Sequence, residues 1–486
     1  MFRLIHIPIL SAMAAVVLAD APEKVESPPL NVETNPMRYL ENERLKFGIN
    51  LAAGGAVTHL EDKIRGGGNM INSHDWGRQI QLSYYSGPVP FIGPNGEKPH
   101  ANWSKLGWNP IQAGSAGGVP SKTTFCESGP DFIRVRCIPM QWPHDNLPGD
   151  CVFEVTYRIT APNVILMEAR LINARLDKRQ HLPARDQEMP ALYTNGPWYR
   201  LITYLGDKPF TGAPLTTVVD KGDAKGWPWS RFLATEQWCA LVNRDGNGVG
   251  LYQPETARMC GGFAGGDDKK GSGGPHDVQT GYISPLARRI LDHNIDLIYR
   301  THIIAGSLEE IRQYAAKQPR PKLAWNFDAD RDGWHYEHAA DTGWPIRGGL
   351  DISFAKAPRG TMVSDERLWH AEDAAKLEIE AAFHPVDGAS TLTAEAVIQP
   401  FGRDDTTDFH SWAAEQSKEA MAEKKRNFPP AKPVTVPFEV QADGVMRIYQ
   451  IPLAGIDGYR GAMKQLRLRF PAADGKARVR RIALVH

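Results

Sequence analysis

The sequence has 486 residues, of which 42% are hydrophobic and 23% are charged. Its 56 Lys and Arg residues balance its 56 Asp and Glu residues, so nucleic acids and anionic membrane surfaces are not expected partners, because both need a basic surface. The apolar content is sufficient for large cores, and the length fits two globular domains. The 45 Gly, 37 Pro and 13 Trp residues favour an all-β fold with many turns.

The N-terminus has the pattern of a secretory signal. Arg3 precedes an apolar stretch from Ile5 to Leu18, followed by the small residue Ala19. We therefore expect a signal peptide over residues 1–19 and a secreted or periplasmic protein. The alternative is an ordinary hydrophobic N-terminus with a single arginine.

Strand patterns recur through the first part of the chain. Residues 45–60 predict a strand, a glycine turn and a second strand, and residues 152–159 and 164–172 predict a hairpin around Pro162 and Asn163. Ser307 and Glu310 form a capping-box pattern that predicts a helix ending before Pro319.

The prolines among charges at 317–322 indicate a domain boundary. The expected domains are residues 20–318, the proposed catalytic domain, and residues 323–486. A polar helical insertion is predicted over residues 412–426 of the second domain.

The five cysteines show no Cys-x-x-Cys spacing, and no zinc-binding spacing appears among the histidines. We expect neither a metal nor a cofactor. Cys137 and Cys151 are the favoured disulfide pair because they flank a predicted turn, and five free thiols are the alternative.

Two resemblances extend these expectations. Segment 325–334 (Trp-Asn-Phe-Asp-Ala-Asp-Arg-Asp-Gly-Trp), with the closing segment 449–457 and the terminal strand, resembles the carbohydrate-binding-module-like jelly rolls of polysaccharide-degrading enzymes. Segments 48–57, 238–252 and 304–312 look like the galactose-mutarotase-like β-supersandwich found in glycoside hydrolases, polysaccharide lyases and epimerases. The resemblances imply a β-supersandwich followed by a β-sandwich of the jelly-roll type, and they leave the reaction to be argued from the site.

The first candidate site is the segment from His74 to Gln79, which also contains Asp75 and Arg78. It joins a loop to a strand rich in polar and aromatic residues, so its polar face is suited to a sugar. The alternative is structural: Asp75 caps the turn and Arg78 pairs with it.

The second candidate site spans residues 181–200, where acids, cations and aromatic residues are concentrated. The residues expected to bind substrate there are His181, Arg185, Asp186, Gln187, Tyr193, Trp198 and Arg200. Glu188 is predicted as the proton donor, because its apolar neighbours Met189 and Pro190 would raise its pKa. Asp75 is the first choice for the second carboxylate, ahead of Asp186 and Glu255. A purely structural pairing of Glu188 with an arginine is the alternative.

Two further features bear on binding. Six tryptophans are candidates for stacking on sugar rings, and some of them must be core: Trp103, Trp108, Trp142, Trp198, Trp227 and Trp229. Residues 261–275 contain seven glycines, which predicts a loop that either covers the site or is an idle surface loop.

The leading interpretation is a secreted glycoside hydrolase that cleaves a poly- or oligosaccharide by carboxylate acid/base chemistry. A polysaccharide lyase is the near alternative, with Tyr193 or His181 as the base and Arg185 or Arg200 neutralising a uronic acid. The third is a non-catalytic glycan-binding protein. The catalytic interpretations depend on Asp75 and Glu188 lying in one sugar-binding site.

Overall fold

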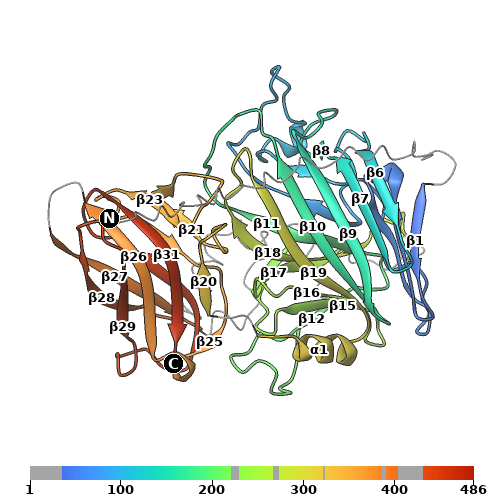
Figure 1. Ribbon diagram of the computed structural model, residues 1–486. Coiled ribbons are helices and arrows are strands. Elements are labelled where there is room, and N and C mark those ends of the chain that lie inside the picture. The colour runs from blue at the N-terminus through green and yellow to red at the C-terminus, as the bar shows by residue number, and fades with distance from the viewer. Residues whose placement is uncertain (1–35, 221–228, 266–272, 321–322, 386–389, 403–430) are drawn as a thin grey trace, which may run out of the picture.

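The computed structural model describes residues 36–220, 229–265, 273–320, 323–385, 390–402 and 431–486 (Figure 1). This part of the chain is built almost entirely from antiparallel strands, which confirms the predicted all-β fold. The predicted signal segment 1–19 and the predicted helix 412–426 lie outside the described residues. No helix in the described ranges is long and apolar enough to span a membrane.

The first part of the chain forms two large sheets. The ten-stranded sheet has the order β1-β2-β3-β4-β11-β18-β17-β14, and β5 and β8 extend it from β4. Its strands are β1 (Met37–Glu41), β2 (Leu45–Asn50), β3 (Ala56–Asp62), β4 (Ile80–Ser83), β5 (Pro110–Ile111), β8 (Met140–Gln141), β11 (Arg185–Thr194), β14 (Ser230–Leu233), β17 (Arg258–Ala264) and β18 (Thr280–Arg289).

The nine-stranded sheet lies against it, in the order β13-β12-β15-β16-β19-β10-β9-β7-β6. Its strands are β6 (Lys122–Ser128), β7 (Phe132–Ile138), β9 (Cys151–Ala161), β10 (Val164–Asn173), β12 (Arg200–Thr203), β13 (Thr216–Val219), β15 (Trp238–Val242), β16 (Asn247–Tyr252) and β19 (Asp296–Ser307). Two short 3-10 helices, η1 (Leu51–Ala53) and η2 (Ala101–Trp103), lie in the connections.

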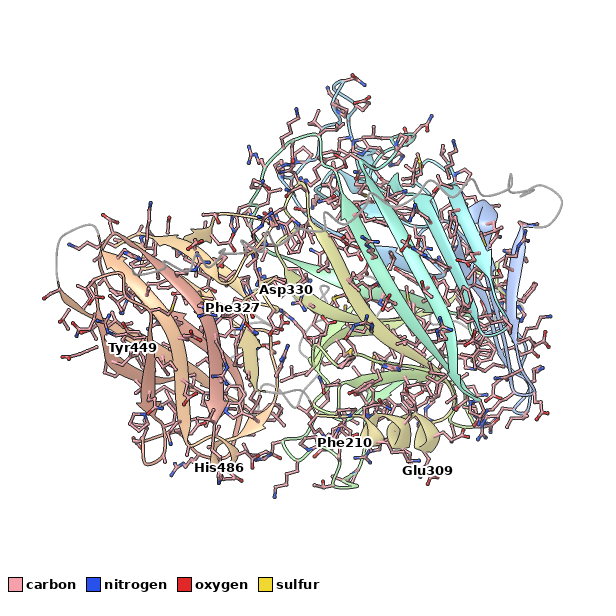
Figure 2. The ribbon with its side chains drawn as sticks, in the orientation of Figure 1. Phe210, Glu309, Phe327, Asp330, Tyr449 and His486 are labelled. Atoms are coloured by element: carbon pink, nitrogen blue, oxygen red, sulfur yellow. The ribbon has the colours of Figure 1, made fainter. Side chains whose placement is uncertain are left out.

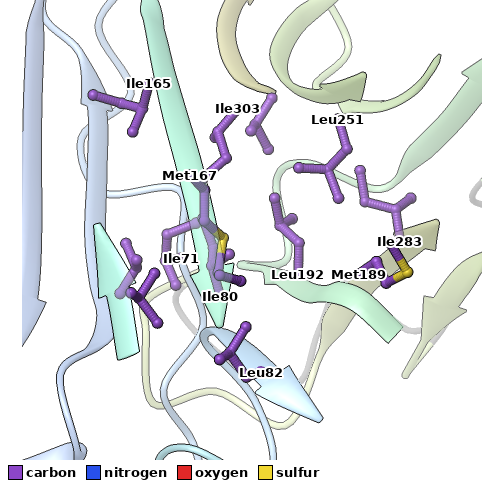
Figure 3. Packing of buried hydrophobic residues seen from close by; sticks show 14 of the residues in the cluster. Ile71, Ile80, Leu82, Ile165, Met167, Met189, Leu192, Leu251, Ile283 and Ile303 are labelled. Carbon is purple, nitrogen blue, oxygen red and sulfur yellow. The ribbon is translucent and has the colours of Figure 1, made fainter. Parts of the chain in front are cut away.

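The two sheets form a sandwich because alternate residues of each strand are apolar and face the other sheet. Figure 3 shows this core, in which Leu192 and Ile283 of the ten-stranded sheet approach Met167 and Ile303 of the nine-stranded sheet. All four side chains are at most 1% exposed. The residues between them on each strand therefore point to the outer faces.

The local predictions for strands are confirmed. β9 and β10 pair as the expected hairpin, and β2 and β3 flank the expected glycine turn. At that turn Gly54 has a φ of 60°, and an added Cβ would lie 2.1 Å from the carbonyl oxygen of Gln112. Only glycine fits this position without displacing the backbone.

The predicted capping box is also confirmed. Helix α1 (Leu308–Lys317) begins at Ser307, whose hydroxyl accepts from the Glu310 amide while the Glu310 carboxylate accepts from the Ser307 amide. Ile311 and Ala315 bury the apolar side of α1 on the outer face of the nine-stranded sheet, around Trp238. The helix therefore covers this outer face over β15, β16 and the end of β19.

The second part of the chain forms two six-stranded sheets that enclose a separate core around Trp325 and Trp334. The first contains β20 (Ala324–Asn326), β22 (Ala339–Asp341), β23 (Leu350–Phe354), β26 (Lys376–Pro385), β29 (Arg447–Pro452) and β31 (Gly475–Val485). The second contains β21 (His335–Glu337), β24 (Thr361–Val363), β25 (Trp369–His370), β27 (Thr391–Pro400), β28 (Val434–Gln441) and β30 (Ala462–Arg469). A short 3-10 helix, η4 (Ala371–Asp373), follows β25.

Buried ion pairs join the two sandwiches. The Arg331 guanidinium contacts Asp292 of the first at 2.9 Å and Asp341 of the second at 2.5 Å. Arg289 contacts Asp365 across the same junction at 2.7 Å. In Figure 2, Phe327 and Asp330 mark the part of the second sandwich from which Arg331 reaches. The predicted domain boundary between residues 318 and 323 falls between α1 and β20 and stays a prediction.

The predicted disulfide between Cys137 and Cys151 is wrong. All five cysteines are free, and Cys137 faces Phe153 rather than Cys151 across the β7–β9 pair. Burial raises the pKa of both the Cys137 and the Cys151 thiols, so these side chains are unreactive core residues.

Candidate functional site

The outer face of the ten-stranded sheet differs from its apolar inner face. Residues that pair across antiparallel strands point to the same side, so Asp186 lies beside Arg288, Glu188 beside Leu286 and Tyr193 beside Tyr282. Glu188 points away from the core because its neighbour Met189 points into it, and Tyr193 and Tyr282 do so because Leu192 and Ile283 point into it (Figure 3). A register shift between Glu188 and Leu192 separates the two parts of β11. We call the following set the outer-face site: Tyr85, Asp186, Glu188, Tyr193, Trp229, Arg231, Arg258, Tyr282 and Arg288.

Glu188 lies in the middle of the outer-face site and is half-buried. One carboxylate oxygen accepts a hydrogen bond of 2.9 Å from the Tyr85 hydroxyl, and the other accepts one from the Tyr282 hydroxyl. Two phenolic donors suit an ionised carboxylate, which is an acceptor on both oxygens. The alternative in which Glu188 pairs with an arginine does not occur among the described residues.

Aromatic rings surround this carboxylate. The Trp229 and Tyr282 rings stack with centroids 5.0 Å apart at an angle of 24°, and the Tyr193 ring lies 4.8 Å from that of Tyr282. Trp229 and Tyr282 are buried, at 8% and 2% exposed, whereas Tyr193 is half-buried and can contact the C–H face of a sugar. Of the candidate tryptophans in the described ranges, Trp229 lies in this set, and Trp227 lies outside the described residues.

Burial raises the pKa of Tyr85, Tyr193 and Tyr282 well above that of an ordinary phenol, and the negative charge of Glu188 adds to the effect at each. The three phenols therefore keep their protons at neutral pH. Tyr85 and Tyr282 donate to Glu188, and none of the three is suited to accept a proton from a substrate.

Asp75 lies in the loop of residues 72–79, beside the outer-face site. Its Oδ1 accepts from the Gly77 amide at 2.9 Å, and its Oδ2 lies 3.3 Å from the Arg78 guanidinium. The turn cap and the Arg78 pair that formed the structural alternative are thus both present. The Asp75 side chain is nevertheless 45% exposed, so it remains accessible to a ligand.

The loop is attached to β11 and to the segment after the glycine-rich stretch. The Tyr193 amide donates to the Gln79 carbonyl at 3.0 Å, and the His74 ring contacts the His276 carbonyl at 2.8 Å. The charges of both Glu188 and Asp75 raise the pKa of the Tyr193 hydroxyl, after burial. The two predicted carboxylates therefore lie within electrostatic reach of one phenol. Residues 266–272 of the glycine-rich stretch lie outside the described residues.

Other predicted residues hold this region in shape. Gln79 is 2% exposed, and its side chain donates to the Asp75 carbonyl at 2.7 Å. Gln187 is buried, where its side chain accepts from the Tyr85 amide at 2.7 Å and donates to the Tyr85 carbonyl at 2.8 Å. Arg185 is exposed at the end of β11. Gln79 and Gln187 are buried and bonded to neighbouring groups of the protein, and their role as substrate-binding residues stays a prediction.

Three predicted residues lie elsewhere. Trp198 is 4% exposed within the core, and Arg200 belongs to β12 of the other sheet, where it pairs with Asp220 at 3.4 Å. His181 lies at the junction, with its ring 6.0 Å from that of Tyr336. These three residues are close to Glu188 in sequence. They lie elsewhere in the structure because the chain leaves the outer face before and after β11. These three are not part of the outer-face site.

Sequence reasoning missed most of the partners of Glu188. Tyr85, Tyr282 and the arginines of β14, β17 and β18 come from strands far apart in sequence, so only the pairing register brings them to β11. The alternation of Tyr282, Ser284, Leu286 and Arg288 was the available signal. The described residues contain no group of three or more His, Cys, Asp or Glu side chains placed to hold a metal ion.

The sequence matches no family model. It also matches no curated protein. Solved structures similar to this chain include a galactose mutarotase related enzyme from Lactobacillus acidophilus, at 10% identity over 56% of this chain and 97% of that one, with a TM-score of 0.36. A GalM/aldose epimerase homologue from C. elegans is 12% identical over 56% and 98% of the two chains, with a TM-score of 0.30. A 4-alpha-glucanotransferase from Thermococcus litoralis is 11% identical over 55% of this chain and 37% of that one, with a TM-score of 0.30.

Proposed function

We propose that the protein is a carbohydrate-active enzyme, specifically a glycoside hydrolase that cleaves a poly- or oligosaccharide at the outer-face site. The observation that carries this proposal is the carboxylate of Glu188, held by Tyr85 and Tyr282 beside the stacked rings of Trp229 and Tyr282. A half-buried carboxylate bordered by packed aromatic rings, of which Tyr193 is partly exposed, combines a reactive group with surroundings that suit a sugar.

The surroundings of Glu188 change its proposed role. Met189 is buried in the core on the other side of the strand, so it does not surround the Glu188 carboxylate as the sequence predicted. Both of its oxygens accept hydrogen bonds from tyrosine hydroxyls, so we assign Glu188 the role of the carboxylate that attacks the sugar or activates water.

A hydrolase also needs a proton donor for the leaving oxygen. We assign this role to Asp75, because it lies beside the site and its exposed carboxyl can regain a proton from water. In the balanced reaction, the leaving oxygen receives a proton through Asp75, and water supplies the hydroxyl group of the other product.

The test is incubation of the purified protein with a panel of neutral and acidic glycans, with products identified by mass spectrometry. Hydrolysis adds the mass of one water across the two products. Cleavage that is lost in both Glu188→Gln and Asp75→Asn, at unchanged thermal stability, supports the proposal. The absence of cleavage across the panel, with glycan binding retained, would instead indicate the non-catalytic binding protein.

A polysaccharide lyase is the second candidate, and one observation favours it: three arginines, Arg231, Arg258 and Arg288, lie around Asp186, two residues before Glu188 on β11. Such cations would neutralise a uronic carboxylate. However, the pKa of Tyr193 is raised, and His181 lies outside the outer-face site, so neither is suited to be the base. Appearance of the ultraviolet absorbance of an unsaturated uronic product, without uptake of water, would establish elimination.

A further inference from the structure

One end of the outer-face site is strongly cationic. Arg231 lies opposite Cys260 on the neighbouring strand, Arg288 lies opposite Asp186, and Arg258 precedes Cys260 by two residues on β17. All three side chains therefore point to the outer face. Asp186 is two residues from Glu188, which places this cationic end about 7 Å along the strand from the Glu188 carboxylate.

The three guanidinium groups approach Asp186 without bonding to it. Their nitrogens lie 3.5 Å (Arg258), 4.0 Å (Arg231) and 4.0 Å (Arg288) from its carboxylate oxygens. Among the described residues no hydrogen bond joins them, and the buried Oδ1 of Asp186 has no hydrogen-bond partner. A buried polar atom without a hydrogen-bond partner is unusual in a folded protein and calls for an explanation.

Glu154 shows the contrast within the same chain. It also has three arginine neighbours, but Arg134 and Arg136 donate to its oxygens at 2.9 Å and 2.6 Å. That cluster is a closed set of ion pairs. The Asp186 cluster is open, because Arg231 and Arg288 have side chains that are 46% and 47% exposed.

Carboxylates balance part of the positive charge at this end. Among the described residues, Arg258 is opposed by Asp186, by Glu366 at 3.9 Å and, farther away, by Asp365. The buried imidazole of His335 responds to this field: burial, followed by Arg288, Arg289 and Arg467, lowers its pKa to about 3, while Asp186 acts in the opposite direction. His335 is therefore neutral and adds no charge.

We propose that Arg231, Arg258 and Arg288 form a subsite for an anionic group, the carboxylate or sulfate of an acidic sugar bound next to the sugar at Glu188. Guanidinium groups present paired donors that match the oxygens of both anions. Asp186 attracts the three guanidinium groups to one place without forming hydrogen bonds to them. Their N–H groups can therefore bind the anion. This inference rests on the proposed function in that it places the acidic sugar beside the bond that is cleaved.

The test compares matched oligosaccharides by isothermal titration calorimetry with the Glu188→Gln variant of the full chain. The probes are uronic-acid oligosaccharides with their carboxyl-reduced counterparts, and sulfated oligosaccharides with their desulfated counterparts. We expect at least one acidic probe to bind about tenfold more tightly than its neutral counterpart, with a preference that weakens as salt is added. The pair that shows the preference distinguishes a carboxylate from a sulfate.

The arginines are then changed. Arg231→Gln with Arg288→Gln should remove the preference, so that the acidic and neutral members of a pair bind with equal affinity. Arg300→Gln is the matched control, because Arg300 is 59% exposed on the nine-stranded sheet and pairs with Glu168. Unchanged melting temperatures establish that each variant is folded.

The outcomes separate this inference from the proposed function. If no acidic probe binds more tightly than its counterpart, or if the preference survives loss of the arginines, the anionic subsite is wrong, even where glycans are hydrolysed. If acidic probes bind through the arginines but the native chain cleaves no glycan, the subsite stands and the hydrolase proposal fails.

Discussion

The Tyr282 hydroxyl donates a hydrogen bond to the carboxylate of Glu188, although the two residues are 94 positions apart. Pairing of β11 with β18 brings them together, and Tyr85 of the segment after β4 supplies the second donor. The two phenols fix the orientation of the carboxylate in the absence of substrate. Such preorganisation lowers the cost of reaching the transition state.

Loss of either phenolic donor should slow the reaction. For Tyr85→Phe and Tyr282→Phe we expect kcat to fall by about tenfold to a hundredfold with a smaller change in KM, because the carboxylate loses one of the bonds that orient it. Steady-state kinetics on the glycan identified by the panel provides the measurement. Tyr314→Phe is the control, since the Tyr314 hydroxyl bonds to His302 beneath α1. Equal rates in all three variants would show that the Glu188 bonds have no catalytic effect.

Removal of the Trp229 side chain should weaken substrate binding. Trp229→Ala removes the ring stacked on Tyr282, and we expect the dissociation constant for an oligosaccharide to rise by about tenfold. Calorimetric titration measures this change. Phe125→Ala is the comparison, because Phe125 lies on β6 of the nine-stranded sheet, where Arg134 and Arg136 cover its ring. A similar loss of affinity in both variants would contradict stacking at Trp229.

Glu310 makes stability depend on pH. Hydrogen bonds from Arg44, from the Ser307 amide and from Arg65 lower its pKa to about 2 despite partial burial. A lowered pKa means that its contribution is complete above about pH 4.5, the ordinary range for a glutamate, and is lost as the pH falls toward 2.

We therefore expect Glu310→Gln to destabilise the protein by about 0.5–1 kcal/mol at pH 7, because the partly exposed ion pairs are lost while glutamine still supports the cap. Urea unfolding at pH 7 and at pH 3 measures the difference, which should shrink at the lower pH. A difference that grows on acidification would reverse the assigned sign.

The junction depends on Arg331. Replacing it with methionine leaves Asp292 and Asp341 buried without their cation, and we expect a loss of about 3–5 kcal/mol. Chemical denaturation measures this loss. Arg478→Gln is the control, because its ion pair with Asp351 is exposed and should matter little. A loss in Arg331→Met no greater than that of the control would show that the junction does not depend on this residue.

The structural features that could be predicted from the sequence are those that depend on residues close together in the chain. The β9–β10 hairpin and the capping box of α1 involve contacts within a few positions, and both are confirmed. The site depends on register between distant strands. For that reason Glu188 was found without Tyr85 or Tyr282, while His181 and Trp198 were included only because they are close in sequence.

The most direct test of the account compares Glu188→Gln with the native chain for both cleavage and binding of one glycan. Glutamine preserves the shape of the side chain and removes the charge that attacks the sugar or activates water. We expect product formation to fall by more than about a hundredfold while the dissociation constant stays within a few-fold. Product formation at the native rate would contradict the assignment of Glu188 and, with it, the location of the chemistry on the outer face of the ten-stranded sheet.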